Sequence, residues 1–133
     1  MANRGLYDGQ TNAPYEKRIA FKFFVDAGNQ PTVPTNPLNF GISTIVWVSQ
    51  GLYRITLLDT YKSHISTSAQ LNVNAAGQQR FCQPGPVANV GTSTAVTVDI
   101  LVVDNAGAVQ NPAAANANNF ISGEIVFCDV GTV

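Results

Sequence analysis

The stretch from Ile45 to Tyr61 reads IVWVSQGLYRITLLDTY and holds two runs of β-type residues separated by Ser-Gln-Gly. Branched and aromatic residues, which favour strands, dominate both runs. In the second run, Tyr53, Ile55 and Leu57 alternate with polar residues, which is the period of two expected where one face of a strand is buried. The Gln-Gly break between the runs permits a tight turn, so the stretch predicts an antiparallel hairpin.

The same alternation recurs along the chain. It predicts further inward faces made of Ile19, Phe21, Phe23 and Val25, of Val96, Val98, Ile100 and Val102, and of Ile121, Gly123, Ile125 and Phe127. Turn residues, Pro and Gly separate the runs, and no helical crossover pattern lies between them. The sequence therefore predicts an all-β fold, an antiparallel β-sandwich of jelly-roll-like type with about seven to eight strands. Including the hairpin, we expect strands near residues 18–25, 40–49, 52–58, 69–73, 79–83, 94–103 and 120–129.

Two details of strand arrangement follow from the same patterns. The run at 94–103 and the run at 120–129 are both amphipathic, and we expect them to pair with each other. The short run at 79–83 is followed by Pro84-Gly85-Pro86, where we expect the strand to stop because proline cannot donate to a ladder.

The length of 133 residues suits one domain with one core. Residues 1–17 are polar and show neither a strand nor a helix period, so we expect an extended N-terminal arm before a β-sandwich domain at 18–133. Such an arm either docks on a neighbour or frays. If it docks, Leu6, Tyr7 and Tyr15 are the candidate anchors.

Charged residues make up 11% of the chain, less than half of the roughly 25% typical of soluble domains. The uncharged polar residues Asn, Gln, Ser and Thr must then solvate the surface. A neutral polar surface of this kind suits a protein that packs against neighbouring proteins. The net charge of -1 and the lack of a basic cluster argue against nucleic-acid binding. No apolar run approaches the roughly 18 residues of a membrane span, and the first residues lack a secretory signal, so we expect no membrane partner.

The chain offers little catalytic equipment. His64 is its single histidine, and we expect it in a solvent-facing loop rather than in a catalytic pair or a metal site. Cys82 and Cys128 lie in strand-like runs, where we expect two buried thiols; a disulfide between them is the alternative. No phosphate loop or dinucleotide fingerprint occurs. The sequence therefore predicts no enzyme, no cofactor and no metal.

Several acidic residues are candidates for a functional site. Asp99 and Glu124 lie on outward faces of predicted strands, and would form a glycosidase-like pair if those strands were neighbours. We favour solvated charges that discourage edge pairing. The run from Asp104 to Gly107 resembles part of a calcium loop but lacks its further oxygen ligands, so it predicts a turn.

Trp47 and Tyr53 are the aromatic residues of the hairpin that invite a functional interpretation. Exposed side by side, they would form a platform on which a sugar stacks. Core packing or an interface anchor is the interpretation we favour for aromatic residues in a hairpin.

The segment 51–61 has the form Gly-x-Tyr-x-Ile-x-Leu-x-Asp-x-Tyr. It resembles a stretch in small virion structural proteins of tailed bacteriophages, including head decoration (cement) proteins. Those proteins are also similar to this chain in a first strand like 18–25, a late Val-Asp-x-Ala-Gly turn like 103–107 and a last strand like 121–127. The pattern Gly-x-Tyr-x-Ile-x-Leu also fits sandwich domains of the C1q and tumour-necrosis-factor type.

The phage resemblance implies a non-enzymatic cement protein, made in the host cytoplasm and seated on the outer surface of the capsid. Its partner would be the major capsid protein, whose neighbouring subunits it bridges, and it would be a homotrimer. Leu6, Tyr7 and Tyr15 would be contact residues, and Trp47 and Tyr53 would lie in the core or at the trimer axis. A tail or neck adaptor or fibre-associated domain is one alternative, and a carbohydrate-binding module is another.

Overall fold

The computed structural model describes residues 16–26, 29–33, 39–72, 80–112 and 119–128. This part of the chain consists of strands, turns and loops without a helix. Its strands are β1 (Glu16–Val25), β2 (Pro31–Thr32), β3 (Ile42–Ser49), β4 (Leu52–Leu57), β5 (Ser63–Asn72), β6 (Arg80–Ala88), β7 (Thr97–Asp104) and β8 (Phe120–Cys128).

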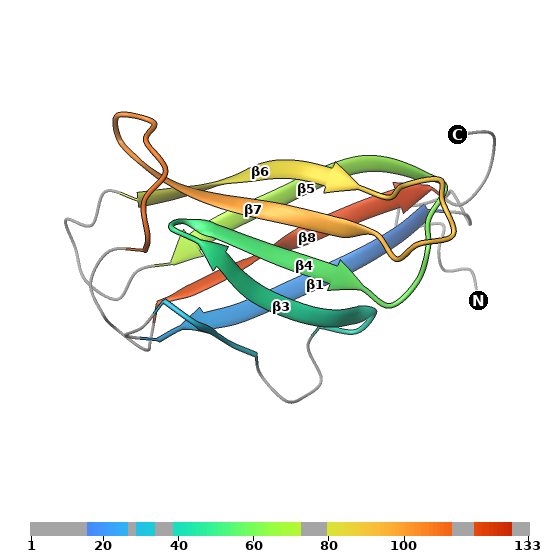
Figure 1. Ribbon diagram of the computed structural model, residues 1–133, viewed down its shortest axis with the longest axis horizontal. Helices are drawn as coiled ribbons and strands as arrows, with labels where there is room; N and C mark the ends of the chain where they lie inside the picture. Colours follow the sequence, from blue (N-terminus) through green and yellow to red (C-terminus); the bar gives the residue numbers. More distant parts are fainter. Residues whose placement is uncertain (1–15, 27–28, 34–38, 73–79, 113–118, 129–133) are drawn as a thin grey trace, which may run out of the picture.

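The strands form two antiparallel sheets that lie one in front of the other (Figure 1). The first sheet has the order β2-β1-β8-β5, and the second has the order β3-β4-β7-β6. The chain crosses from the first sheet to the second after β2 and after β5, and it returns after β4 and after β7. The predicted antiparallel β-sandwich is therefore confirmed.

The predicted hairpin joins β3 to β4, with Ile45 opposite Ile55 and Trp47 opposite Tyr53. Gly51, in the turn, has a φ of 67°, in the left-handed region that favours glycine. Its N–H donates to Asn111 Oδ1 at 2.8 Å, so the turn is also tied to the loop after β7. A side chain at this position would collide with the backbone of that loop.

The core lies between the sheets and is built by alternate residues of the long strands. These side chains face inward with little or no exposure, and each contributes roughly 1.5–3 kcal/mol by leaving water. Aromatic rings link the two layers: Phe23 lies 5.3 Å from Tyr53 and Tyr61 stacks 4.3 Å from Phe127, measured between ring centroids. The predicted inward faces are confirmed, with Ile19, Phe21, Phe23 and Val25 in β1, Tyr53, Ile55 and Leu57 in β4, Val98, Ile100 and Val102 in β7, and Ile121, Ile125 and Phe127 in β8.

The predicted pairing of the two late strands is wrong. β7 pairs with β4 and β6 in the second sheet, whereas β8 pairs with β1 and β5 in the first. Both strands are amphipathic because both bury one face, and this periodicity identifies the buried face without identifying the neighbouring strand.

The predicted stop of the sixth strand is also wrong. β6 continues through Pro84-Gly85-Pro86 to Ala88, with a shift of register between Pro84 and Val87. β6 is an edge strand, so a proline N position can face away from the ladder, and the irregularity absorbs the extra residues.

The first strand begins slightly earlier than the expected domain boundary at 18. Glu16 and Lys17 already pair with Cys128 and Phe127 of β8. The rest of the predicted arm, with Leu6, Tyr7 and Tyr15, lies outside the described residues.

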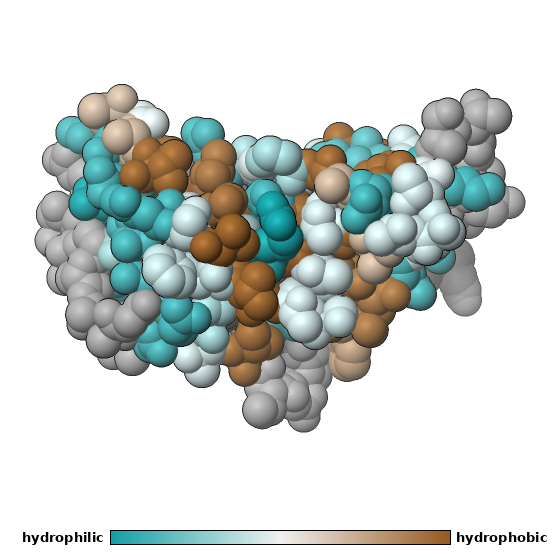
Figure 2. Space-filling model, in the orientation of Figure 1, coloured by the Kyte–Doolittle hydropathy of each residue, from teal (hydrophilic) through white to brown (hydrophobic). Residues whose placement is uncertain are grey.

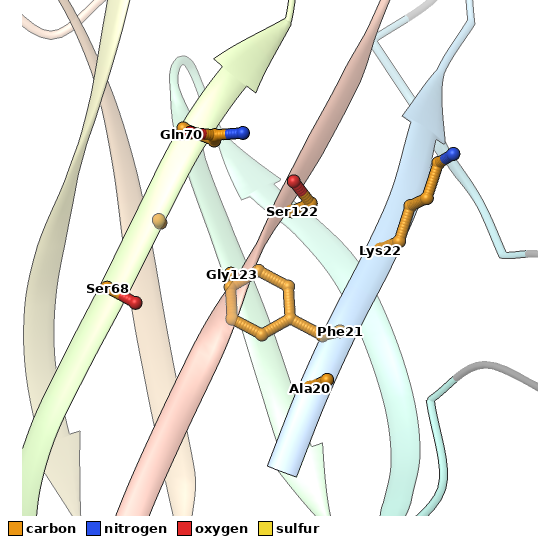
Figure 3. Close-up of a pocket in the computed structure, with 8 residues that line it drawn as sticks. Ala20, Phe21, Lys22, Ser68, Gln70, Ser122 and Gly123 are labelled. Atoms are coloured by element: carbon orange, nitrogen blue, oxygen red, sulfur yellow. The ribbon is translucent and has the colours of Figure 1, made fainter. Parts of the chain in front are cut away.

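Gly123 of β8 lies opposite Ala69 of β5, close to the backbone of that strand. A Cβ at this position would overlap the carbonyl oxygen of Ser68, a backbone atom that cannot swing aside. The ring of Phe21, opposite Gly123 in β1, fills the space beside the glycine (Figure 3).

We therefore expect Gly123→Ala to lower the free energy of unfolding by roughly 1–3 kcal/mol, the usual cost of overpacking. Gly107→Ala is the control, because a Cβ there meets no atom within 4 Å and costs only about 1 kcal/mol for its positive φ. Urea denaturation of both variants measures the difference. Equal losses would contradict the steric account of Gly123.

Candidate functional site

The two hairpin aromatics lie on the inner side of the second sheet. Tyr53 has no exposed surface, and its hydroxyl donates to the carbonyl oxygen of Asn29 at 2.9 Å. Burial raises the pKa of Tyr53 above its ordinary value. Trp47 is half-buried and packs against the core. The two residues therefore do not form an exposed platform for a sugar, and Tyr53 takes the core position that was one of its two expected places.

Asp99 points outward from β7, as expected, but it is not solvated. It is 5% exposed, and its two carboxylate oxygens accept hydrogen bonds from Arg54 Nε at 2.7 Å and Nη2 at 2.8 Å. The hydrogen bond to Asp99 raises the pKa of Arg54. The expectation of a solvated charge at this position is therefore wrong.

The neighbouring strand explains the burial of Asp99. A Cβ on Gly85 of β6 would lie 3.0 Å from the backbone oxygen of Asp99 and 3.2 Å from its Cβ. The irregular backbone of β6 thus packs against Asp99 on one side, and the Arg54 guanidinium covers its carboxylate on the other. The two hydrogen bonds from Arg54 compensate the buried negative charge of Asp99.

Glu124 lies on the outer face of the other sheet. It accepts a hydrogen bond from Arg18 Nη1 at 2.9 Å, and Arg18 also binds Glu16 at 2.9 Å. The hydrogen bond to Glu16 is the main reason for the raised pKa of Arg18. Asp99 and Glu124 thus belong to different sheets and different ion pairs, and the structure does not bring them together as a catalytic pair.

The outer face of the first sheet carries a shallow groove of about 440 Å³. Small side chains of β1, β8 and β5 line it, among them Ala20, Ser122 and Ser68, with Gln70 and Lys22 at its borders (Figure 3). The ammonium group of Lys22 lies 4.2 Å from the centre of the Phe120 ring. The lining residues of the groove include no acidic side chain, and its one cation, Lys22, is directed over an aromatic ring.

The outer face of the second sheet has a different chemistry. On this face of the molecule, groups of apolar side chains lie among polar and neutral ones (Figure 2). Leu52 of β4 lies opposite Leu101 of β7, and Phe81 of β6 lies opposite Val103 of β7. We call the following outward-facing set the apolar strip: Val46, Val48, Leu52, Leu101, Phe81 and Val109.

The sequence contains a signal for the apolar strip, which the predictions above do not include. Alternation identifies the residues that face the core, and the strip consists of apolar residues that lie between those positions. Val46 and Val48 flank Trp47 in β3, so both faces of that strand are apolar. Such a strand is expected either inside a larger assembly or between two layers.

The run at Asp104 forms the predicted turn. Its carboxylate accepts hydrogen bonds from the N–H groups of Ala106 at 2.9 Å and Ala108 at 3.0 Å. The bond from Ala108 is the main reason that the pKa of Asp104 lies below its ordinary value. The carboxylate of Asp104 therefore stabilises the turn in which it lies.

His64 contradicts the expectation of a solvent-facing loop. It lies in β5, half-buried, with its ring edge toward Phe127 at 5.6 Å between centroids, and its Nε2 is 2.7 Å from Thr67 Oγ1. Loss of water contact lowers the pKa of His64, against a weaker opposite effect of a backbone hydrogen bond with Ser66. The Ser- and Thr-rich composition of β5 concealed its strand character.

Cys82 and Cys128 do not form a disulfide. Cys82 packs against the core from β6, and burial raises the pKa of its thiol to about 12. A thiol in this state is a poor nucleophile at neutral pH, because the thiolate is the reactive form.

Within the described ranges, no three His, Cys, Asp or Glu side chains gather in a way that could hold a metal ion. In the same part of the chain, no helix is long and apolar enough to cross a membrane. Comparison with protein families, with curated proteins and with solved structures finds no match to this chain.

The two arginine ion pairs differ in burial and therefore predict different effects of substitution. Arg54→Met leaves the buried carboxylate of Asp99 without its partner, so we expect the thermal midpoint to fall by several degrees. Arg18→Met is the matched control, because Glu124 and Arg18 are both exposed and such pairs contribute little. Differential scanning calorimetry measures both. An equal effect of the two substitutions would contradict the importance of burial at Asp99.

His64 also predicts a pH dependence of stability. Its folded-state pKa is lowered, so the unfolded chain binds more protons than the folded one below the ordinary value of about 6.5. The stability is therefore complete above that pH and is lost as the pH falls through about 6.5 toward the folded value. Urea midpoints between pH 7.5 and 5 measure this, and His64→Gln should flatten the profile. An unchanged profile in the variant would show that other groups cause it.

Proposed function

We propose that the protein is a non-enzymatic structural protein of a tailed-bacteriophage virion, of the head decoration (cement) type. It binds the major capsid protein on the outer head surface and bridges neighbouring subunits. The observation that carries this proposal is the apolar strip, an exposed surface without unpaired charge on a sheet whose inner side already forms the core. A surface of this kind is suited to lasting contact with protein.

The resemblance of the segment 51–61 supplies the virion context, and the structure gives that segment a definite role. Its alternate residues Tyr53, Ile55 and Leu57 lie in the core, and Tyr61 stacks on Phe127. The motif is therefore a framework motif, which supports kinship in fold. The contacts that bind partners must come from other parts of the surface.

A cement protein strengthens a shell by adding interfaces that must be broken before subunits separate. A standard protein interface buries about 1,600 Å² in total, and each further copy adds its contacts to the same shell. A rigid sandwich with a stable core suits this task, because little ordering is needed on binding. By the resemblance, the bound unit is a homotrimer.

The N-terminal arm is the proposed capsid contact. Glu16, the first described residue, pairs with Cys128 at the end of the first sheet, so the arm joins the domain at this end. From there Leu6, Tyr7 and Tyr15 can reach a neighbouring subunit. Deletion of residues 1–15 spares β1 and the ion pair of Glu16 with Arg18.

We expect deletion of residues 1–15 to lower the binding to purified heads by about tenfold or more, because three large contact side chains are lost. Co-sedimentation with heads measures the binding, and urea denaturation checks that the domain stays folded. The matched control replaces Asn3, Gln10 and Asn12 with Ala and should bind normally, whereas the same change at Leu6, Tyr7 and Tyr15 should reproduce the deletion. Normal binding by the deleted protein would remove the arm from the proposal.

The location of the protein on virions tests the proposal as a whole. Antibody labelling in the electron microscope should mark the head shell at many places. Labelling confined to the tail or neck would favour the adaptor or fibre-associated alternative instead. The carbohydrate-binding alternative needs saturable binding to a glycan at a site other than Trp47 and Tyr53, since these residues face the core.

A further inference from the structure

The two outer faces of the sandwich differ in the groups they offer to a neighbour. The outer face of the first sheet carries the ion pairs of Arg18, a row of small polar side chains, and the ammonium group of Lys22 over the rings of Phe24 and Phe120. Charged and polar groups thus lie beside the apolar ones on this face. The outer face of the second sheet instead carries the apolar strip, of which Val46, Val48, Phe81 and Val109 are exposed.

Several members of the apolar strip are neighbours in the sheet. Leu52 and Leu101 are direct neighbours on the adjacent central strands β4 and β7. Val103, opposite Phe81, also forms a bridge with Val109 in the loop after β7. The strip is therefore wider than one scattered apolar residue, and polar neighbours interrupt it where Val46 lies opposite Arg54 and Leu101 opposite Gln83.

The charges on this face cancel each other. Arg54 and Asp99 bind each other through two hydrogen bonds, so the face presents no unpaired charge in the described residues. A partner that is selected by charge has little to recognise here. A partner that fits must itself be a neutral, apolar protein surface of similar extent.

We infer that this face is the contact between copies of this chain, so that a second copy covers the apolar strip. The inference rests on the proposed function, in which the protein acts as an oligomer on the capsid. In the homotrimer that the resemblance implies, the apolar strip of each copy would contact the surface of one neighbouring copy. Most soluble oligomers are built from identical chains in closed symmetry, and three copies close when each makes the same head-to-tail contact with the next.

The area of the face is large enough for this contact. Four strands spaced about 4.8 Å apart, each with about eight residues rising about 3.3 Å, give a footprint of roughly 500 Å² for each copy. Two copies would bury roughly 1,000 Å² or more, the size above which a specific interface is expected. Arg54 stands among the apolar side chains, and buried arginines at interfaces often carry much of the binding energy.

The test compares two substitutions on the strip with one on the other sheet. Phe81→Glu and Val46→Glu place an unpaired carboxylate in the contact, whereas Ile65→Glu places one on β5 of the first sheet. Phe81 is 55% exposed and Ile65 is 52% exposed. Substitution with Glu should therefore lower the stability of the folded monomer by a similar amount at the two positions. Urea denaturation verifies that each variant is folded.

Light scattering over a concentration series measures the mass in solution. We expect the full chain to have a mass that is a multiple of 14.1 kDa greater than one, and we expect the Ile65→Glu variant to keep it. Each substitution on the strip should raise the dissociation constant by about tenfold or more. A wild-type monomer at 100 μM, or strip variants that associate as the wild type does, would overturn the inference.

Hydrogen exchange of the wild type provides a second measurement that needs no variant. Amides of β3 and β6 should become more protected as the protein concentration rises, whereas those of β1 should not change. Protection that is independent of concentration would contradict the inference. Head binding by a monomer would contradict the inference and leave the proposed function intact. An oligomer that does not bind heads would support the inference and contradict the proposed function.

Discussion

The aromatic contacts between the two sheets are the interaction on which the rest of the structure depends. Phe23 reaches across the core to Tyr53, and Tyr61 stacks on Phe127, so rings from β1, β4 and β8 and from the segment after β4 hold the layers together. These contacts require each strand to present the correct alternate residues to the core. A shift of one residue in register would turn the buried set of a strand toward the outside. The register of the central strands therefore determines both the core and the composition of the outer faces.

This dependence explains which parts of the fold were predictable. Alternation along one strand reveals its buried face, so the inward residues of β1, β4, β7 and β8 were predicted correctly. The neighbour of a strand is a property of the whole chain, because any two amphipathic strands can pair. The partners of β7 and β8 were therefore predicted wrongly, although each strand was found. The course of β6 through two prolines depends on its place at an edge, which local sequence does not reveal.

The candidate site was less predictable, for a physical reason that Asp99 illustrates. The outward position of Asp99 follows from alternation, but its burial follows from the backbone of Gly85 in a neighbouring strand and from Arg54 on another. His64 is a similar case, since the ring of Phe127 reaches it only after β5 and β8 have paired. Such environments are made by pairing across the sheet. The alternation within one strand shows on which face of the sheet these side chains lie. It does not show which residues of the adjacent strands surround them.

The ion pair within the apolar strip bears on how specific a contact there would be. A purely apolar face binds any apolar surface, whereas a covered Arg54 would have to keep its bond to Asp99 and find acceptors for its remaining N–H groups. Only a partner that offers acceptors at the right place avoids the cost of an unsatisfied buried guanidinium. The Arg54–Asp99 pair thus lowers the affinity for partners without such acceptors more than for a partner that has them. This difference in affinity lets the strip distinguish between surfaces of similar hydrophobicity. The apolar side chains of the strip therefore favour contact with another apolar surface. The Arg54 guanidinium restricts which surface can bind and in which orientation.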